Sequence, residues 1–211
     1  ASQDTSEGNK GLSAFVHDMN LPGISRGKRE DKMGIRGSPT SSIMYDSVRV
    51  PKSALLYQEN RGFTVAMTTL NGGRIGVAAQ AIGIARAAFD DSFRYSQERR
   101  AFGKQICEHQ SIQNYFADMV CHIDSARYLT LDAAKRKDKK QSYVRQAAMA
   151  KLFASETAMM CAVKGIQIHG GYGYVTDYPA ERHLRDAKIT EIYEGTSEIQ
   201  RILIATQLLK E

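Results

Sequence analysis

The sequence predicts a mainly α protein, in which a C-terminal antiparallel helical bundle is preceded by part of a β domain. Two observations support this fold class. After residue 60, long stretches carry apolar residues at the three-and-four spacing of amphipathic helices. Before that point glycine, proline and serine are frequent and apolar runs are short, which is typical of strands and turns. The predicted domains are therefore a partial β domain at residues 1–60 and the helical bundle at residues 61–211.

Strands are predicted in the N-terminal domain at residues 11–19 and 41–50. Pro51 ends the second strand, because proline cannot donate a hydrogen bond to a β-ladder. Within this strand the alternation of apolar residues slips by one position between Tyr45 and Val48. That slip predicts a β-bulge.

The first predicted helix covers residues 63–99 and is rich in alanine and other small residues. It contains the pair Gly72–Gly73, and each glycine costs a helix about 1 kcal/mol relative to alanine. Such a pair predicts the close approach of another backbone or of a ligand. Plain contact between helices explains the pair equally well.

A second helix is predicted at residues 111–137, with Ser111 as its N-cap. Its apolar stripe consists of Ile112, Phe116, Met119, Val120, Ile123 and Ala126. A third helix is predicted at residues 142–166. The side chains expected in its core are Ala148, Met149, Leu152, Phe153 and Met159.

A glycine-rich connection at residues 169–180 leads to two further helices. One is predicted to start near Pro179, a residue suited to a first helical turn, and the last near Thr196 or Ser197. Ser197 and Gln200 fit the S-x-x-Q capping box. Long helices with short joints predict an antiparallel bundle.

The chain of 211 residues has a formal net charge of +6, part of which comes from the run KRKDKK at residues 135–140. A short basic run without interleaved aromatic residues is typical of a solvated helix end, so we predict no nucleic-acid partner. The basic balance suits a small ligand that carries phosphates. No stretch approaches the roughly 18 to 20 apolar residues of a membrane span, so none is predicted.

The cysteines, Cys107, Cys121 and Cys161, are odd in number and scattered along the chain. This pattern argues against a disulfide framework and for a reducing compartment. The sequence contains no C-x-x-C pair, and no glutamate has a histidine three residues later, the spacing of di-iron bundles. We therefore predict no metal site.

Six stretches carry a more specific signal because they follow one another in a characteristic order and spacing. They are EDKMGIRGSPT (30–40), NGGRIGVAAQAIGIA (71–85), ERRAFGKQICEHQSIQ (98–113), AAMAKLFASE (147–156), IQIHGGYGYVTDYPAERHLRDAKI (166–189) and IYEGTSEIQR (192–201). Together they resemble the acyl-CoA dehydrogenase family of flavoproteins, most closely its short-chain and short/branched-chain members. Family members have a helical domain, a β domain and a helical bundle, so the resemblance implies that this chain is a C-terminal portion.

The resemblance implies FAD-dependent α,β-dehydrogenation of a short or branched short-chain acyl-CoA to a trans-2-enoyl-CoA. In the family a base takes the α-proton while a hydride leaves Cβ for the flavin. The matching base is Glu194, flanked by Tyr193 and Gly195, and its backbone N–H helps to bind the thioester carbonyl. Such a reaction needs a positioned carboxylate, since the α-proton of a thioester is a poor acid. An isolated Y-E-G-T would more simply be a helix-end carboxylate beside the N-terminus of the next helix.

Other members of the family place their base on the first bundle helix, directly before the arginine of the NGGR motif. Here that position is Gly73, so Glu194 is the carboxylate that remains at either family position. The residues that match the family's substrate contacts on this helix are Asn71, Gly72, Gly73 and Arg74. The missing side chains would let a thin acyl-pantetheine chain pass, and helix packing explains them equally well without the resemblance.

Two groups of residues match the family's FAD contacts. The first group, which in the family comes from a neighbouring subunit, consists of Arg99, Gln110, Gln167, Ile168, His169, Gly170 and Gly171. Arg99 offers a fork of donors suited to pyrophosphate, although a solvated charge beside Glu98 would be the simpler explanation of an isolated arginine. The second group, at a helix N-terminus, consists of Thr196, Ser197 and Glu198.

The resemblance further implies an electron-transfer flavoprotein as electron acceptor, a homo-oligomer that is a dimer of dimers, and a role in fatty acid β-oxidation. The implied location is the mitochondrial matrix in a eukaryote and the cytoplasm in a bacterium. Two alternatives remain open. The same site could work physiologically as a 2-enoyl-CoA reductase, or the chain could be a truncated, non-catalytic helical assembly module.

Overall fold

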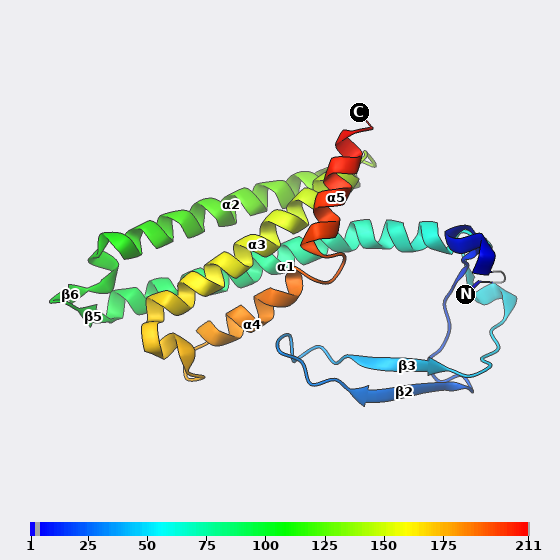
Figure 1. Cartoon of the computed structure of the whole chain (residues 1–211), viewed down its shortest axis with the longest axis horizontal. Coiled ribbons are helices and arrows are strands. Elements are labelled where there is room, and N and C mark those ends of the chain that lie inside the picture. The colour runs from blue at the N-terminus through cyan, green and yellow to red at the C-terminus, as the bar shows by residue number, and fades with distance from the viewer. Residues whose placement is uncertain (3–4, 211) are drawn as a thin grey trace. The chain divides into compact units, whose positions relative to one another are not determined.

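The computed structural model describes residues 1–2 and 5–210 and is mainly helical, as predicted (Figure 1). The chain divides into two compact units. The N-terminal unit comprises Ala1–Lys32 and Arg36–Leu70, and the C-terminal unit comprises Met33–Ile35 and the residues from Asn71 onward. The division therefore falls inside the first long helix.

The N-terminal unit contains short strands and short 3₁₀-helices. Its strands are β1 (Ala14–Phe15), β2 (Ile24–Arg29), β3 (Ser41–Tyr45) and β4 (Leu55–Leu56). Strand β1 pairs antiparallel with β4, and β2 pairs antiparallel with β3. The 3₁₀ turns are η1 (Thr5–Gly11) and η2 (Lys52–Ala54).

The strand predictions were right in place but wrong in length. Of the first predicted strand, at 11–19, Ala14–Phe15 forms a strand paired with β4, and Leu12 forms an isolated bridge with Ser2. The second, at 41–50, ends at Tyr45 because Ser47 adopts a left-handed backbone with φ of 49°. The slip in apolar alternation thus marks the end of β3, and the predicted bulge within it is wrong.

Strand β2 was not predicted, and the register irregularity of this sheet lies on it, between Arg26 and Arg29. Its sequence, ISRGKR, has one apolar residue and no alternation, so periodicity gives no strand signal. Pairing with β3 determines the strand here.

The C-terminal unit is the predicted bundle. Its helices are α1 (Gly62–Glu98, which starts in the N-terminal unit), α2 (Gln110–Asp138), α3 (Val144–His169), α4 (Ala180–Thr190) and α5 (Ser197–Leu208). Figure 1 shows α1, α2 and α3 side by side, and α3 also contacts α4 and α5. The hairpin of β5 (Arg100–Ala101) and β6 (Lys104–Gln105) joins α1 to α2.

Small side chains fill most of the core between these helices. The fully buried alanines include Ala78, Ala81, Ala85, Ala126, Ala133, Ala147, Ala150, Ala154 and Ala158. The predicted stripe of α2 is confirmed at Phe116, Met119, Ile123 and Ala126, whereas Val120 is 38% exposed. On α3, Ala148 is buried as predicted, but Met149, Leu152, Phe153 and Met159 are only half-buried. Alanine at the contact face lets the helices approach closely, which moves the larger side chains to the periphery.

The predicted helix N-caps differ from the observed ones by one or two residues. His109, not Ser111, is the N-cap of α2, and Pro179 is the N-cap of α4, not a first-turn residue. Thr196 is the N-cap of α5, and its hydroxyl accepts from the backbone N–H of Ile199 at 3.5 Å. The predicted capping box, which required Ser197 as the cap, is therefore wrong.

A three-residue loop, Met33–Ile35, belongs to the C-terminal unit because it binds α4. The backbone N–H of Ile35 donates to Asp186 Oδ1 at 2.6 Å, and Arg185 Nη1 donates to the Met33 carbonyl at 2.8 Å. Between them, a Cβ on Gly34 would lie 2.3 Å from the carbonyl oxygen of Arg185. Only glycine fits this approach of two backbones.

Within residues 1–2 and 5–210, no helix combines the length and the apolar character that crossing a bilayer requires.

Candidate active site

The turn between α4 and α5 has an unusual backbone. Glu194 has φ of 56° and Gly195 has φ of 97°, so consecutive residues adopt left-handed conformations. This region suits glycine but is uncommon for a glutamate, which persists there only if its surroundings hold it. The backbone N–H of Ser197 closes the turn by donating to the Glu191 carbonyl at 3.0 Å.

The side chain of Glu194 returns from this turn to α1. Its Oε2 is buried, and no described residue donates a hydrogen bond to it. A Cβ on Gly73 would lie 2.5 Å from Oε2 and 3.2 Å from Oε1, so the carboxylate occupies the space that a side chain at position 73 would fill. The glycine pair does mark a close approach, and at Gly73 the approaching group of the protein is the side chain of Glu194 and not a backbone.

Arg74 is buried and lies between Glu194 and Asn71. Its Nε donates to the Glu194 carbonyl oxygen at 3.4 Å, and its Nη1 donates to Asn71 Oδ1 at 2.5 Å. Burial lowers the pKa of the guanidinium, and the negative charge of Glu194 partly offsets this effect. The fold therefore brings Glu194 to Asn71, Gly73 and Arg74, which are far from it in the sequence.

Tyr193 also contacts α1, whereas Gly72 of α1 is less closely approached. The hydroxyl of Tyr193 donates to Gln80 Oε1, and burial raises the pKa of this phenol. A Cβ on Gly72 would meet only the flexible end of Lys137, 3.1 Å from its Nζ. Gly72 is thus less constrained than Gly73.

Sequence reasoning missed two residues that hold the turn, Lys151 and Gln200. Both side chains are fully buried. Lys151 Nζ donates to the Gly195 carbonyl at 2.7 Å, while Gln200 Nε2 donates to the same oxygen at 2.9 Å and to the Glu194 carbonyl at 3.2 Å. A signal for Lys151 existed, since it lies three and four residues from Ala154 and Ala147, on the face that α3 buries.

Five of the predicted cofactor residues of the first group line one groove of about 550 Å³. They are Arg99, Ile168, His169, Gly170 and Gly171. His169 stacks on Tyr95 with ring centroids 4.4 Å apart, and Arg99 lies over the ring of Tyr172 at 5.7 Å. A Cβ on either glycine would meet open space, so a ligand can approach the backbone here, while the Gly170 N–H itself caps α3 by donating to the Ile166 and Gln167 carbonyls.

Gln110 and Gln167 of the same group are exposed and do not line this groove. Gln110 is the first residue of α2, and Gln167 lies in the last turn of α3.

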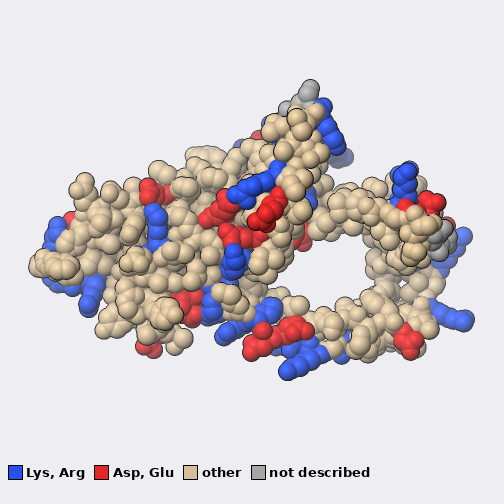
Figure 2. Space-filling view, in the orientation of Figure 1, with Lys and Arg blue, Asp and Glu red and all other residues tan. Residues whose placement is uncertain are grey.

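The second predicted cofactor group, Thr196, Ser197 and Glu198, lines a different groove of about 500 Å³ at the start of α5. Figure 2 shows acidic and basic side chains gathered on this face. The residues that line it further are Glu156, Lys188, Glu191, Ile192 and Arg201. Ser197 Oγ is buried and, among the described residues, has no hydrogen-bond partner. In the described part of the chain the two grooves share no residue.

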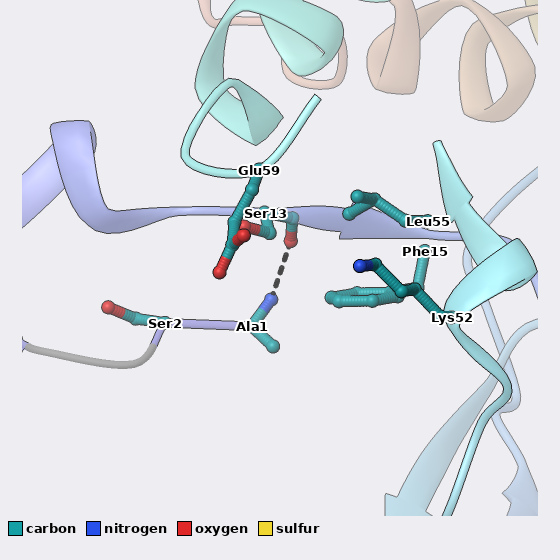
Figure 3. Close-up of a pocket in the computed structure, with 7 residues that line it drawn as sticks. All are labelled: Ala1, Ser2, Ser13, Phe15, Lys52, Leu55 and Glu59. Atoms are coloured by element: carbon teal, nitrogen blue, oxygen red, sulfur yellow. Dashed lines mark hydrogen bonds between the residues drawn. The ribbon is translucent and has the colours of Figure 1, made fainter. Parts of the chain in front are cut away.

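A smaller hollow of about 250 Å³ lies in the N-terminal unit (Figure 3). There the N-terminal amine of Ala1 donates to the Ser13 carbonyl at 2.8 Å, beside the side chains of Phe15 and Leu55. None of the residues predicted to bind substrate or cofactor lines it. Over the described ranges, 1–2 and 5–210, no three His, Cys, Asp or Glu side chains are arranged to hold a metal ion.

The turn after α4 thus sets a carboxylate against the first bundle helix, beside a buried arginine. Residues 60–209 match the family model described as the C-terminal domain of acyl-CoA dehydrogenases. The chain belongs to the acyl-CoA dehydrogenase family. The acyl-CoA dehydrogenases to which it is similar are FAD-dependent flavoproteins.

Individual relatives agree with this membership. The chain is 52% identical over 210 residues to the mitochondrial short-chain specific acyl-CoA dehydrogenase of Homo sapiens, covering 100% of this chain and 51% of that protein. It is 44% identical over 211 residues to a subunit of the caffeyl-CoA reductase–Etf complex of Acetobacterium woodii, covering 100% of this chain and 56% of that protein. The chain thus spans about half the length of the curated relatives it matches.

The fold has equally similar solved structures. The butyryl-CoA dehydrogenase of Megasphaera elsdenii superposes with a TM-score of 0.98 at 48% identity, over 99% of this chain and 55% of that one.

Proposed function

We propose that this chain forms the C-terminal half of an FAD-dependent acyl-CoA dehydrogenase that acts on short or branched short-chain acyl-CoAs. In this proposal Glu194 is the base that removes the α-proton, and the product is a trans-2-enoyl-CoA. The similarity to the human short-chain enzyme, 52% over the whole chain, supports the substrate class.

The observation that carries the proposal is the environment of Glu194 Oε2. This oxygen is buried, and the described residues leave it without a hydrogen-bond donor. Its lone pairs are therefore available to a substrate proton, as a general base requires. A glutamate that merely stabilised the N-terminus of α5 would instead direct its carboxylate to the free N–H groups of that helix. Here the carboxylate lies against Gly73 of α1.

The chain's own residues would bind and orient the acyl-CoA around this oxygen. For proton transfer the α-carbon must lie within about 3 to 3.5 Å of Oε2. The backbone N–H of Glu194 would donate to the thioester carbonyl, where negative charge develops as the proton leaves. Arg74 donates to the carbonyl of the same residue, and so helps to hold the backbone of this turn.

The two grooves fit an FAD. Open space around Gly170 and Gly171, beside the Arg99 guanidinium, suits a diphosphate and a nucleoside. The unpartnered hydroxyl of Ser197 at the N-terminus of α5 suits a polar or anionic cofactor group. When bound, the flavin supplies the hydride acceptor for Cβ. Because the two grooves share no described residue, we propose that one FAD takes its contacts from two subunits of a homo-oligomer.

The test is Glu194→Gln in the full-length protein. We expect flavin content and acyl-CoA affinity to be retained and turnover to fall by at least about 1,000-fold, since the amide cannot accept the proton. Glu108→Gln is the matched control. Glu108 closes a capping box with Gln105, a role that glutamine also performs, so its turnover should equal the wild-type value. Near-normal turnover of Glu194→Gln would show that Glu194 is not the base.

A second candidate function is the reverse reaction, reduction of a 2-enoyl-CoA at the same site. The names of two relatives favour it, the caffeyl-CoA reductase–Etf complex subunit and a 3-(aryl)acrylate reductase of Clostridium sporogenes that is 47% identical. Rates measured in both directions with an electron-transfer flavoprotein, the partner that we propose, distinguish the two candidates. Faster acyl-CoA oxidation supports the dehydrogenase, and faster enoyl-CoA reduction supports the reductase.

We place the protein in the mitochondrial matrix if its source is a eukaryote and in the cytoplasm if it is a bacterium. The mitochondrial name of the human relative supports the first case.

A further inference from the structure

Lys151 is a buried titratable residue that the proposed chemistry does not use. It lies in the N-terminal third of α3, and among the described residues its side chain is the largest that is fully buried. In the described part of the chain its Nζ has no carboxylate within ion-pair distance. Its hydrogen-bond acceptor is the carbonyl oxygen of Gly195, 2.7 Å away.

Packing does not explain a lysine at this position. Removing an ammonium group from water costs several kcal/mol unless a charged partner compensates it. An apolar side chain of similar length, such as methionine, would fill the space without that cost. Burial lowers the pKa of Lys151 to about 8, and the negative charge of Glu191 offsets only part of this shift.

The benefit that offsets this cost lies in the turn that Lys151 contacts. The left-handed backbone conformation of Glu194 costs about 1 to 2 kcal/mol. The carbonyls of Glu194 and Gly195 accept from Gln200, and each accepts from one further buried donor, Arg74 and Lys151 respectively. Together these donors fix the orientation of the peptide planes on both sides of Gly195.

We infer that Lys151, together with Gln200, is a positioning residue for Glu194: these side chains hold the left-handed turn so that the carboxylate lies against Gly73. Without them the Glu194 backbone relaxes toward a right-handed conformation, and the carboxylate moves away from α1. This inference rests on the proposed function, because it requires that Glu194 removes a proton.

The test uses the full-length holoenzyme and separates proton removal from the rest of the reaction. The probe is 3-thiabutyryl-CoA, in which sulfur replaces Cβ, so that the thioester has α-protons but no hydride to give. In D₂O, the base takes an α-proton and returns a deuteron from solvent, and NMR follows the exchange. Oxidation of a short-chain acyl-CoA gives kcat and KM for the same proteins.

For Lys151→Met we expect α-proton exchange and kcat to fall by about 10- to 100-fold, the effect of displacing a catalytic group by roughly an ångström. KM, flavin content and the Kd for the probe should stay within about threefold of wild type, since binding groups are untouched. Lys164→Met is the matched control, because Lys164 is also on α3 but pairs with Asp118 at the surface. Its exchange rate should equal the wild-type rate.

Exchange at the wild-type rate in Lys151→Met overturns the inference, and so does a raised KM with unchanged kcat. If Lys151→Met does not accumulate as folded protein, the Gln200→Met variant tests the inference in its place, because it removes the other donor to the Gly195 carbonyl. Slowed exchange in that variant supports the inference, and wild-type exchange overturns it. Failure of the proposed function is distinguishable, since then the wild-type protein itself exchanges no α-protons.

Discussion

At the scale of single residues, Gly73 and Glu194 are sterically complementary. The carboxylate occupies the volume that any side chain on Gly73 would need, at a distance of 2.5 Å from an added Cβ. Real Cβ atoms do not approach an oxygen this closely, so one of the two groups must move. The glycine is therefore needed for the position of the carboxylate.

We predict that Gly73→Ala in the full-length enzyme lowers kcat by about 10-fold or more, because the methyl group displaces the carboxylate from its place on α1. Gly76→Ala is the matched control, since a Cβ there meets open space on the same helix. It should keep wild-type turnover and raise the free energy of unfolding by about 0.5 to 1 kcal/mol. Equal turnover of the two variants would contradict the steric argument.

The sequence predicted this site only in part. The motif that contains Glu194 and the motif that contains Gly73 were both identified, and the fold brings them together. The contact itself could not be predicted, because it depends on how far the turn after α4 reaches toward α1. Lys151 was missed because a lysine in a helix is normally expected to point to solvent. Gln200 was interpreted as a capping residue, and its long-range bonds to carbonyls have no local signal.

At the scale of elements, periodicity predicted the long helices well and the strands poorly. The apolar spacing in α1 and α2 extends over many turns, so the prediction averages over many residues. The strands of the N-terminal unit are short, and β2 has almost no apolar residues, so its pairing comes from β3 alone. A helix N-cap depends on a single side chain, so the predicted N-cap positions were wrong by one or two residues.

The start of α5 gives a prediction at this scale. Thr196→Ala should lower the free energy of unfolding of the apoprotein by about 0.5 to 1 kcal/mol, because the first turn loses its capping oxygen. Thr196→Ser keeps that oxygen and should be close to wild type. Ser197→Ala should cost less than Thr196→Ala, since the Ser197 hydroxyl has no partner within the described residues. Urea unfolding measures the free energy of unfolding of all three variants. A larger loss for Ser197→Ala than for Thr196→Ala would show that Ser197 is the N-cap, as the capping box requires.

At the scale of the whole molecule, the separation of the two grooves leads to a prediction about how subunits share an FAD site. Arg99 lines one groove, and the residues that follow Glu194 line the other. If each FAD uses both grooves from different subunits, a complete site needs Arg99 of one copy and Glu194 of another.

We therefore predict that two inactive variants complement each other. Glu194→Gln and Arg99→Met should each be inactive as pure full-length proteins, the second through loss of FAD. Mixed oligomers formed by co-expression contain sites with an intact Glu194 and an intact Arg99, and should recover about one quarter of wild-type activity. Complementation fails if both residues serve a site from the same subunit. Activity per subunit is the measurement, because sites that lack Arg99 bind no FAD and count as inactive.

The fit between Gly73 and Glu194 also limits how such a site can change over evolutionary time. A carboxylate introduced on α1 while Glu194 remains collides with it, and loss of Glu194 alone leaves no base at either position. Transfer of the base between these two positions therefore needs two substitutions. Each alone lowers activity, and the activity of the double variant is not the sum of the two separate effects. A lineage with either arrangement can therefore reach the other only through a less active intermediate. The reason is steric, because the two side chains would occupy the same volume.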